Sequence, residues 1–379
     1  MKHVLVQRCP DGYRTALTEN GKLIEYVVDR RDSSIVGNVY KGIIKKINTG
    51  FIFLDIGLTQ QAFLDTRDSR EKGLLNGSKL IVKQGDELIV QILKDPLGDK
   101  GPVATSNIAY TGRFAVVSKS VDGDKITLSR KIDRANGERL LQQLGDAIPS
   151  GFLVILRTAA AERTVAEITN EITQLVSQFD KHAEWSCARP PAVLREEPPI
   201  LRTLRDLTTD DIDATITDCR ELIAQNPHLQ LQYYDSAQYN AQPIFEHYFL
   251  QTQIAKLRDK RVWLNSGAFI VIEQVEACVV IDVNTGKSSG RNNNTDAAKI
   301  KVNMEAAKEI ARQLRLRNLS GIIIIDFIAM KSQDDIDALT DFLRHEFRKD
   351  RIPTVAVGMT TLGLMEVTRK RTRNVINAH

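Results

Sequence analysis

Residues 279–286, VVIDVNTG, form a run of branched apolar residues that ends on the carboxylate of Asp282, and the carboxamide of Asn284 follows two residues later. Residues 321–327, GIIIIDF, repeat this pattern and stop on Asp326. A charged side chain that leaves water costs several kcal/mol unless a partner compensates for it. One aspartate at a strand end is typical of a turn or a helix cap. Two of them in neighbouring strands indicate a shared role.

A predicted helix connects the two strands. After the polar loop at residues 284–296, apolar residues recur at intervals of three and four from about Ala297 to Arg317, which predicts an amphipathic helix. A strand, a helix and a second strand form a crossover unit, in which the strands are parallel and a right-handed connection is favoured. A second amphipathic helix is predicted after the capping-box-like SQDD at residues 332–335.

The crossover unit predicts a metal site. In an open parallel sheet, ligands bind beyond the carboxyl ends of the strands. Adjacent strands lie about 4.8 Å apart, so Asp282 and Asp326 can share one ion. Two oxygen ligands with retained water suit Mg²⁺, with Mn²⁺ as a possible substitute. We therefore predict a phosphodiester hydrolase site in which these carboxylates hold the metal and Asn284 orients a carboxylate or a phosphate oxygen.

Two other interpretations compete with the metal site. Each aspartate, taken alone, fits a turn or a helix cap. The second competitor is a nucleotide site, because VNTGKSSG at residues 283–290 contains Gly-Lys-Ser between a strand and a helix. A phosphate-binding GxxxxGK[ST] loop would require glycine where Ile281 stands, so the ATPase interpretation is weak.

Length and composition indicate the general class of protein. A chain of 379 residues predicts two to four domains, and 42% hydrophobic with 26% charged residues is ordinary for a globular protein. No apolar run reaches the roughly 18 residues of a membrane helix, and the N-terminal residues do not resemble a signal peptide, which predicts a cytoplasmic protein. The four cysteines are scattered, which predicts neither disulfides nor a zinc site. A net charge of +4 permits a polyanionic partner.

Residues 36–107 have a different pattern of apolar and polar residues from the C-terminal part. Short alternating segments separated by Gly, Asn and Asp turns predict a small antiparallel barrel. Alternation places Phe51 and Phe53 on one face, and lysines lie nearby in the sequence. For any one aromatic residue, the barrel core is the simpler interpretation. The alternative is a platform on which unpaired bases stack while lysines contact phosphates. The Pro-rich residues 188–199 are interpreted as a linker.

Longer motifs resemble one known family. VVIDVNTG at 279–286, NMEAAKEIARQLRLRNLSGIIIIDFIAM at 303–330 and TLGLMEVTRKRTR at 361–373 are similar to the catalytic core of the RNase E/RNase G family, with the closer likeness to its RNase G branch. VGNVYKGII, FIFLDIGL, QAFLD and LKDPLGDKG are similar to the S1-type domain of that family, and KITLSRKI and LVILRTAA to its 5′-end sensor. The likeness covers nearly the whole chain.

The resemblance implies an α/β multidomain fold. Its expected parts are an RNase H-like subdomain at residues 1–33 and 203–258, an inserted S1-type OB-fold barrel at 34–107, a 5′-end sensor domain at 108–202 and a DNase I-like α/β catalytic domain at 259–379. The implied activity is that of a Mg²⁺-dependent endoribonuclease specific for single-stranded RNA. Such an enzyme leaves 5′-phosphate and 3′-hydroxyl ends, prefers 5′-monophosphorylated RNA, and acts in rRNA maturation and mRNA turnover.

The resemblance also implies roles for individual residues. Asp282 and Asp326 match the metal-binding aspartates of the family, and Asn284 matches its assisting asparagine. The positions that match the pocket for a 5′-monophosphate are Arg157, Thr158, Arg130 and Val116. The positions that match RNA contacts on the barrel and its edge are Phe53, Phe63 and Lys100.

A basic cluster, Arg369, Lys370, Arg371 and Arg373, closes the catalytic section. On composition alone it is typical of a solvated helix face. Beside a metal site for RNA, it is predicted to neutralise backbone phosphates, which would make binding fall steeply with salt.

Three departures from the family pattern keep a rival open. Pro353 stands where RNase E has a second sensor arginine, and Arg351, two residues earlier, is a candidate substitute. Ala329 stands where an acidic residue is usual. The CPxC zinc-link motif is not found, so a zinc-linked dimer is not implied, and a homodimer without it stays a possibility. The rival is a non-catalytic RNA-binding protein that has kept the fold.

Overall fold

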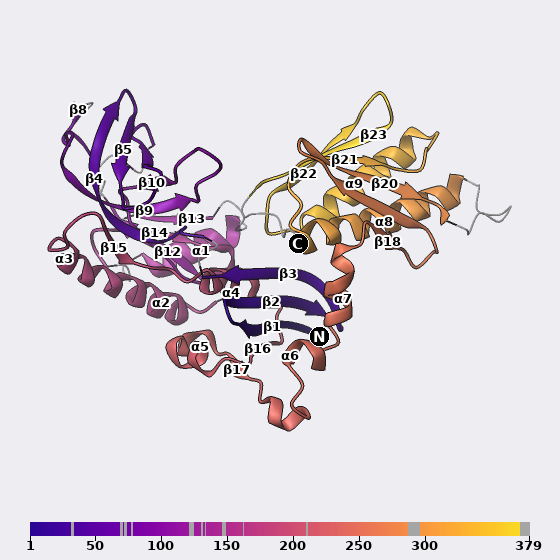
Figure 1. Ribbon diagram of the computed structural model, residues 1–379, viewed down its shortest axis with the longest axis horizontal. Coiled ribbons are helices and arrows are strands. Elements are labelled where there is room, and N and C mark those ends of the chain that lie inside the picture. Colours follow the sequence, from indigo (N-terminus) through magenta and orange to yellow (C-terminus); the bar gives the residue numbers. More distant parts are fainter. Residues whose placement is uncertain are drawn as a thin grey trace. The chain divides into compact units, whose positions relative to one another are not determined.

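The computed structural model describes residues 1–31, 34–68, 71, 74–76, 79–120, 125–129, 132, 134–145, 149–161, 163–209, 211–286 and 296–371. The chain divides into two compact units, one formed by Met1–Asp29 with Asp211–His379 and the other by Arg30–Asp210 (Figure 1). None of the helices within the described residues is long and apolar enough to span a membrane.

The first unit contains a five-stranded sheet built from two distant parts of the sequence. Its order is β17 (Gln232–Tyr233), β16 (Ala214–Thr217), β1 (Lys2–Cys9), β2 (Gly12–Glu19) and β3 (Lys22–Arg30). β1 pairs with β2 in antiparallel fashion along its whole length and with β16 in parallel. Strands from residues 1–33 and 203–258 therefore share one sheet. The short helices α5 (Arg220–Gln225), α6 (Ile244–His247) and α7 (Gln251–Ala255) follow.

A six-stranded sheet forms the rest of the first unit. Its order is β18 (Arg261–Trp263), β19 (Phe269–Gln274), β20 (Cys278–Asn284), β21 (Gly321–Asp326), β23 (Leu364–Arg369) and β22 (Thr354–Met359). β20 and β21 are parallel and α8 (Asp296–Leu316) connects them, which confirms the predicted crossover unit. The expectation of an open parallel sheet is wrong, because the other pairings are antiparallel. Short turns join β18 to β19, β19 to β20 and β22 to β23, and a short turn can connect only antiparallel neighbours. β23 pairs with β21 after the chain has passed through α9 and β22.

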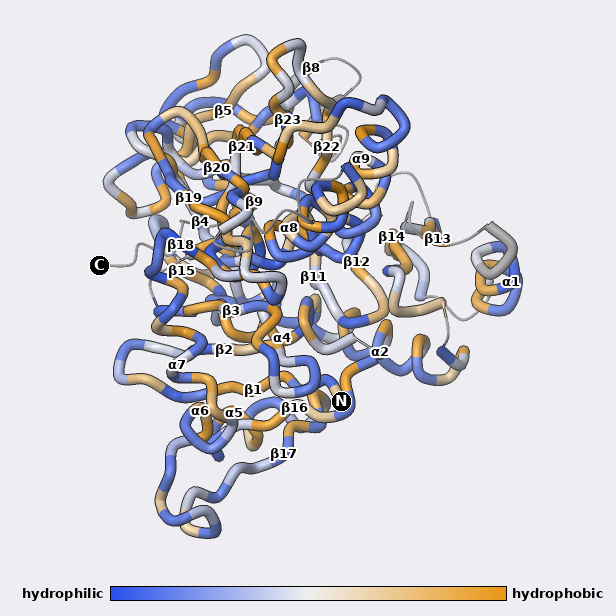
Figure 2. The backbone as a smooth tube through the Cα atoms, turned by 90° about the vertical axis from the view of Figure 1, so that its right-hand side faces the viewer, coloured by the Kyte–Doolittle hydropathy of each residue, from blue (hydrophilic) through white to orange (hydrophobic). Residues whose placement is uncertain are grey.

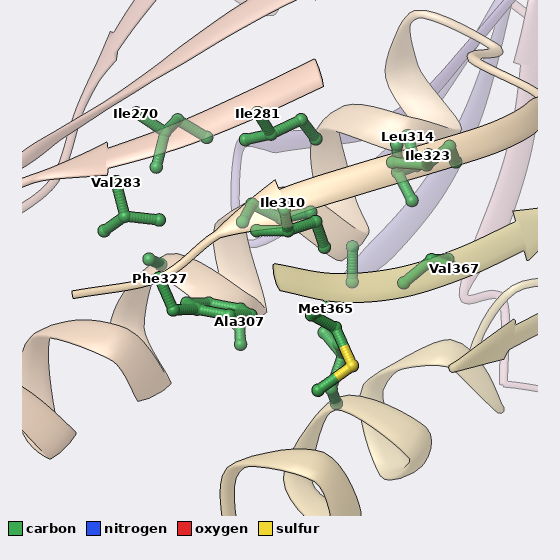
Figure 3. Close-up of a cluster of buried hydrophobic side chains, with 14 of the residues drawn as sticks. Ile270, Ile281, Val283, Ala307, Ile310, Leu314, Ile323, Phe327, Met365 and Val367 are labelled. Carbon is green, nitrogen blue, oxygen red and sulfur yellow. The ribbon is translucent and has the colours of Figure 1, made fainter. Parts of the chain in front are cut away.

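Alternation along these strands buries one face of the sheet. Ile281, Ile323, Met365 and Val367 lie within a cluster of buried side chains to which α8 contributes Ile310 (Figure 3). α9 (Gln333–Phe347) contributes Leu339, Leu343 and Phe347, and Figure 1 shows both helices beside the sheet. The side chains at the intervening strand positions are largely exposed. Figure 2 shows the same contrast along the chain, with orange segments in the strands and mostly blue loops.

The start of α9 differs from the expected capping box. Ser332 occupies the N-cap position, but its side chain makes no capping hydrogen bond. The third helical residue is Asp335, whereas a capping box uses the longer Glu or Gln to reach back to the N-cap backbone. Asp334 and Asp335 in the first turn still interact favourably with the helix dipole.

The second unit contains a closed barrel of five strands. They follow the order β4 (Val39–Asn48), β5 (Phe51–Asp55), β6 (Ala62–Asp65), β10 (Val103–Thr105) and β9 (Glu87–Lys94), and β9 pairs again with β4 to close the barrel. The predicted barrel is therefore present, although β6 and β10 pair in parallel. Its core contains Ile52, Leu54, Ala62 and Leu64. The short strands β7 (Leu75–Asn76) and β8 (Lys79–Leu80) pair separately.

The Pro-rich stretch at residues 188–199 is more than a linker. Within it, β15 (Ala192–Arg195) pairs with β4 and so joins the barrel sheet at its edge. Prolines on both sides of the strand are compatible with this place, because an edge strand does not need all its backbone donors.

A four-stranded sheet completes the second unit. Its order is β11 (Ala109–Thr111), β12 (Ala115–Lys119), β14 (Phe152–Leu156) and β13 (Lys125–Leu128). The accompanying helices are α1 (Arg134–Leu144), α2 (Val165–Ser177), α3 (His182–Trp185) and α4 (Pro199–Leu207). Buried residues of the sheet, α1, α2 and α3 form one core, which includes Val154, Ile168 and Trp185.

Candidate active site and RNA-binding surfaces

The two aspartates lie side by side in the sheet of the first unit. β20 and β21 run parallel with Ile281 opposite Ile325 and Asp282 opposite Asp326. Opposed residues on adjacent strands have side chains on the same face, about 5 Å apart at the backbone. Both aspartates are exposed, while Ile281 and Ile325 on the other face are completely buried. The packing of the apolar face therefore fixes the direction in which the two carboxylates project.

Asn284 belongs to the same group of side chains. It ends β20, and its Nδ2 donates a hydrogen bond to Oδ2 of Asp282 at 2.7 Å. The carboxamide thus restrains the rotation of the Asp282 carboxylate and occupies one lone pair of one oxygen. The other oxygen of Asp282 and both oxygens of Asp326 can accept further ligands. The structure therefore brings all three predicted catalytic residues together.

The donor set fits one hard divalent ion. Within the described part of the chain, no group of three or more His, Cys, Asp or Glu side chains is arranged to hold a metal ion, so this edge of the sheet offers two carboxylates. Mg²⁺ is commonly bound through one or two carboxylates, with water and substrate phosphate as the remaining ligands. The Gly-Lys-Ser of the competing nucleotide motif extends into residues 287–295, which lie outside the described residues.

Aromatic residues of the barrel form an exposed platform. Phe53 on β5 is opposite Phe63 on β6, and the rings of Phe51 and Phe63 are 6.3 Å apart in an edge-to-face arrangement. All three are partly exposed, whereas the intervening Ile52 and Leu54 are completely buried. The simpler interpretation, that the aromatic residues form the barrel core, is therefore wrong for these three and holds for Tyr40 on β4, which is buried in that core. The strand alternation that fills the core turns them outward.

The basic residues of the barrel differ in exposure and in their partners. Lys46, opposite Phe53, and Lys100, on the turn after β9, are exposed. Lys41 is buried, and its Nζ is 2.8 Å from Glu87 Oε2, so it is a structural residue. Arg67 was not selected from the sequence. Its guanidinium lies 4.4 Å from the centre of the Phe51 ring and donates to Asp65 at 2.8 Å. The signal that could have identified it is its position two residues after the segment QAFLD at residues 61–65.

Three of the residues expected around a 5′-phosphate lie on or directly after the two central strands of the four-stranded sheet, β12 and β14. Arg157 follows β14, its Nη1 donates to the Gly112 carbonyl at 2.7 Å, and its Nη2 lies 3.3 Å from Asp206 Oδ1. Thr158, the next residue, is exposed. Val116 lies on β12 opposite Ile155.

The guanidinium of Arg157 is thus already oriented by protein groups. A phosphate would have to share it with the carboxylate of Asp206. Arg130, the fourth expected residue of the pocket, lies outside the described residues.

The basic cluster requires a correction. Arg369 ends strand β23 and is not part of a helix, and only 2% of its side chain is exposed. Its Nε donates to Asp350 Oδ2 at 2.7 Å, and its Nη1 donates to Asn318 Oδ1 and to the Leu319 carbonyl, each at 3.0 Å. The predicted RNA contact of Arg369 is therefore wrong, because its guanidinium is buried and hydrogen-bonded to other groups of the protein.

The remaining members of the cluster differ from Arg369. Lys370 and Arg371 are exposed and can meet phosphates. Arg373 lies outside the described residues.

The departures from the family pattern have structural correlates. Ala329 is exposed three residues after Asp326, where an acidic side chain would have added charge near the site. Arg351, considered as a substitute sensor, donates from its Nε to Glu25 Oε1 at 2.7 Å. Glu25 is buried, so this pair already engages the guanidinium within the first unit.

Comparison with known proteins gives independent information about the family of this chain. Residues 109–372 match the family described as the ribonuclease E/G family. Ribonuclease G of Escherichia coli (strain K12) is 33% identical over 402 aligned residues, which cover 98% of this chain and 80% of the relative. Ribonuclease G of Haemophilus influenzae is 32% identical, and the alignment covers 98% of this chain and 79% of the relative. Ribonuclease E of Nostoc sp. is 32% identical over 89% of this chain and 51% of the relative.

Proposed function

Because this chain belongs to the ribonuclease E/G family and is accordingly an endoribonuclease, a phosphodiester hydrolase, we propose that Asp282, Asn284 and Asp326 form its catalytic site. The observation that carries this proposal is the register of the two parallel strands, which sets Asp282 directly opposite Asp326. The hydrogen bond from Asn284 to Asp282 supports it, because it holds one carboxylate in a defined orientation. The ribonuclease relatives favour this assignment over the rival of a protein that only binds RNA.

The proposed cofactor is Mg²⁺, with Mn²⁺ as a substitute, held by Asp282 and Asp326. When bound, such an ion activates water and offsets negative charge on the reacting phosphate. The carboxylates of this chain supply the negative charge that retains a cation beside RNA, and Asn284 limits their motion. Cleavage of this type leaves a 5′-phosphate and a 3′-hydroxyl.

The barrel is proposed to hold single-stranded RNA. Bases can stack on the outward-facing rings of Phe53 and Phe63, since every base presents an aromatic face and stacking tolerates any sequence. Lys100, Lys370 and Arg371 are exposed cations and are proposed to contact phosphates. A duplex keeps its bases stacked on one another, so a platform of this kind favours unpaired RNA.

Arg157 and Thr158 are proposed to recognise a 5′-monophosphate. An arginine fork can donate two parallel hydrogen bonds to a terminal phosphate. Because Asp206 Oδ1 lies 3.3 Å from Arg157 Nη2, we expect a weaker preference for 5′-monophosphorylated RNA than in a pocket with two unpaired arginines. Pro353 supplies no second guanidinium, and Arg351 is paired with Glu25.

The finer organisation belongs to the same proposal. Residues 1–33 and 203–258 are assigned to an RNase H-like subdomain, 34–107 to an S1-type OB-fold, 108–202 to the 5′-end sensor and 259–379 to a DNase I-like catalytic domain. Supporting this division are the shared sheet of β1 and β16, the closed barrel and the separate six-stranded sheet. We place the activity in rRNA maturation and mRNA turnover, and accumulation of rRNA precursors in cells that lack the protein would support this. Homodimerisation without a zinc link is testable by mass measurement in solution.

Cleavage of a short fluorescent single-stranded RNA tests the catalytic assignment. We expect Asp282→Asn and Asp326→Asn each to slow cleavage on the order of 100-fold or more, because they weaken charge stabilisation worth several kcal/mol. The matched control is Asp341→Asn on α9, which removes a carboxylate that is 76% exposed in the same unit. Sequencing of product ends and titration of Mg²⁺ complete the experiment. A wild-type rate equal to that of the two aspartate variants would refute the assignment.

A further inference from the structure

A buried carboxamide on α8 holds the chain immediately beyond the catalytic strand β21. Asn303 is completely buried. Its Nδ2 donates to the Ile328 carbonyl at 2.9 Å, and its Oδ1 accepts from the Ile328 N–H at 3.0 Å. Both backbone polar groups of one residue are therefore paired with one side chain, as they would be in a β-ladder.

This pairing begins where the ladder of β21 stops. Asp326 is the last residue of the strand, and Ile328 lies two residues further on. Phe327, between them, is buried in the core. The path of the chain directly after Asp326 is thus defined by one apolar side chain and by the two hydrogen bonds of Asn303. Movement of this segment would turn the Asp326 carboxylate relative to Asp282.

Glu305, two residues after Asn303 on α8, holds the other side of the site. Its Oε1 accepts from the N–H groups of Asn265 at 2.7 Å and Ser266 at 3.3 Å, in the turn that precedes β19. The first residue of β19, Phe269, is opposite Asn284 in the sheet. Glu305 therefore anchors the turn beside the end of β20.

A glycine shows how closely the two loops approach each other. Gly286 follows β20 and has a positive φ of 66°. A Cβ at this position would lie 2.2 Å from the carbonyl oxygen of Gly267, in the turn that Glu305 anchors. The loop after Asn284 therefore rests on that turn, and a displaced turn would displace the loop.

We propose that Asn303 and Glu305 are positioning residues, which set the geometry of the two halves of the divalent-ion site from a single helix. The inference rests on the proposed function of Asp282 and Asp326 and extends it to residues that touch neither RNA nor metal. Helix α8 is the crossover between the two catalytic strands, so one rigid element carries both anchors.

Four variants of the full chain test this inference. Asn303→Ala removes both hydrogen bonds to Ile328, and Glu305→Ala removes the acceptor of the turn. Glu305→Gln keeps a carbonyl oxygen at that place and serves as the conservative variant. The control is Gln313→Ala, about 15 Å further along α8, where Gln313 is 3% exposed and bonds with Glu309 and Arg317.

Three quantities are measured for each variant. They are the affinity for Mn²⁺ without RNA, by the signal of free Mn²⁺ in electron paramagnetic resonance, the Mg²⁺ concentration that gives half-maximal cleavage, and the thermal midpoint. We expect Asn303→Ala and Glu305→Ala to weaken Mn²⁺ binding and raise the Mg²⁺ requirement about tenfold, as loss of supporting contacts around metal ligands does. Glu305→Gln should behave as the wild type. Gln313→Ala should lower only the thermal midpoint.

The outcomes separate this inference from the proposed function. If the wild type binds Mn²⁺ and cleaves RNA, but Asn303→Ala and Glu305→Ala shift only the thermal midpoint, the positioning role is overturned and the catalytic assignment stands. If Asn303→Ala does not fold, the comparison of Glu305→Ala with Glu305→Gln decides, and equal Mn²⁺ affinities of these two variants overturn the role. A wild type that neither binds Mn²⁺ nor cleaves overturns both.

Discussion

Replacement of Arg369 separates a buried structural cation from the exposed cations that follow it. Arg369→Met keeps much of the side-chain volume but removes the charge that faces Asp350. Both side chains of the pair are only 2% exposed. Removal of one partner of a buried pair costs about 3–5 kcal/mol, because the other charge is left in a medium that solvates it poorly.

The surroundings of Asp350 place the expected loss at the lower end of that range. Its carboxylate also accepts from the Ile352 N–H at 2.9 Å and from Thr354 Oγ1 at 3.1 Å, which remain in the variant. Arg315 is close enough to interact as well: burial lowers the pKa of Arg315, and the nearby carboxylate of Asp350 opposes that shift. We therefore expect Arg369→Met to lower the free energy of unfolding by about 3 kcal/mol.

The assay combines urea unfolding with RNA binding at several salt concentrations. Arg369→Met should unfold at lower urea but keep the salt dependence of RNA binding, since its charge does not reach solvent. Lys370→Ala and Arg371→Ala should change stability by less than about 0.5 kcal/mol. Each should reduce the slope of log K against log salt by about 0.7, as expected for one lost phosphate contact to a single strand. A stable Arg369→Met protein with a reduced salt slope would refute the reasoning.

Three further outcomes are expected. Partial burial, with Lys119 and Arg195 nearby, lowers the pKa of His182 from 6.5 to about 4. Between these two pH values the unfolded chain therefore binds a proton that the folded chain does not. The free energy of unfolding should therefore fall as the pH drops from 6.5 towards 4. The same measurement on His182→Gln by urea unfolding should give a flatter pH profile unless the assignment is wrong. Phe53→Ala and Phe63→Ala should each weaken binding of single-stranded RNA by about 1–3 kcal/mol in fluorescence anisotropy, with unchanged thermal midpoints, and unchanged affinity would exclude the stacking platform. Wild-type protein should cleave 5′-monophosphorylated RNA faster than 5′-hydroxyl RNA. Asp206→Asn should increase the ratio of the two cleavage rates, and Arg157→Ala should reduce it to one. Equal wild-type rates on the two RNAs would show that the pocket does not sense the 5′ end.

Much of the candidate site could be predicted from patterns of residues close together in the sequence. Asp282 and Asp326 stand out because each interrupts an apolar run, and the helix between them requires parallel strands. Arg369 shows a signal that was available but not used. Met365, Val367 and Arg369 alternate along β23, so the third should point to the same buried face as the first two. A basic composition alone suggested an exposed helix, because it reports charge and not the direction of a side chain.

The amino-acid sequence by itself determined the apolar strands that end on carboxylates, the helix that makes them parallel and the short alternating strands of a barrel, because each of these depends on residues close together in the chain. Only the tertiary structure decided the exact opposition of Asp282 and Asp326, the entry of β15 into the barrel sheet and the pairing of Arg369 with Asp350. Those features join residues that are distant in sequence, and a side chain is buried or exposed according to what packs against it. Periodicity predicts which face a residue occupies, but the partner on that face is settled by the packing of the whole unit.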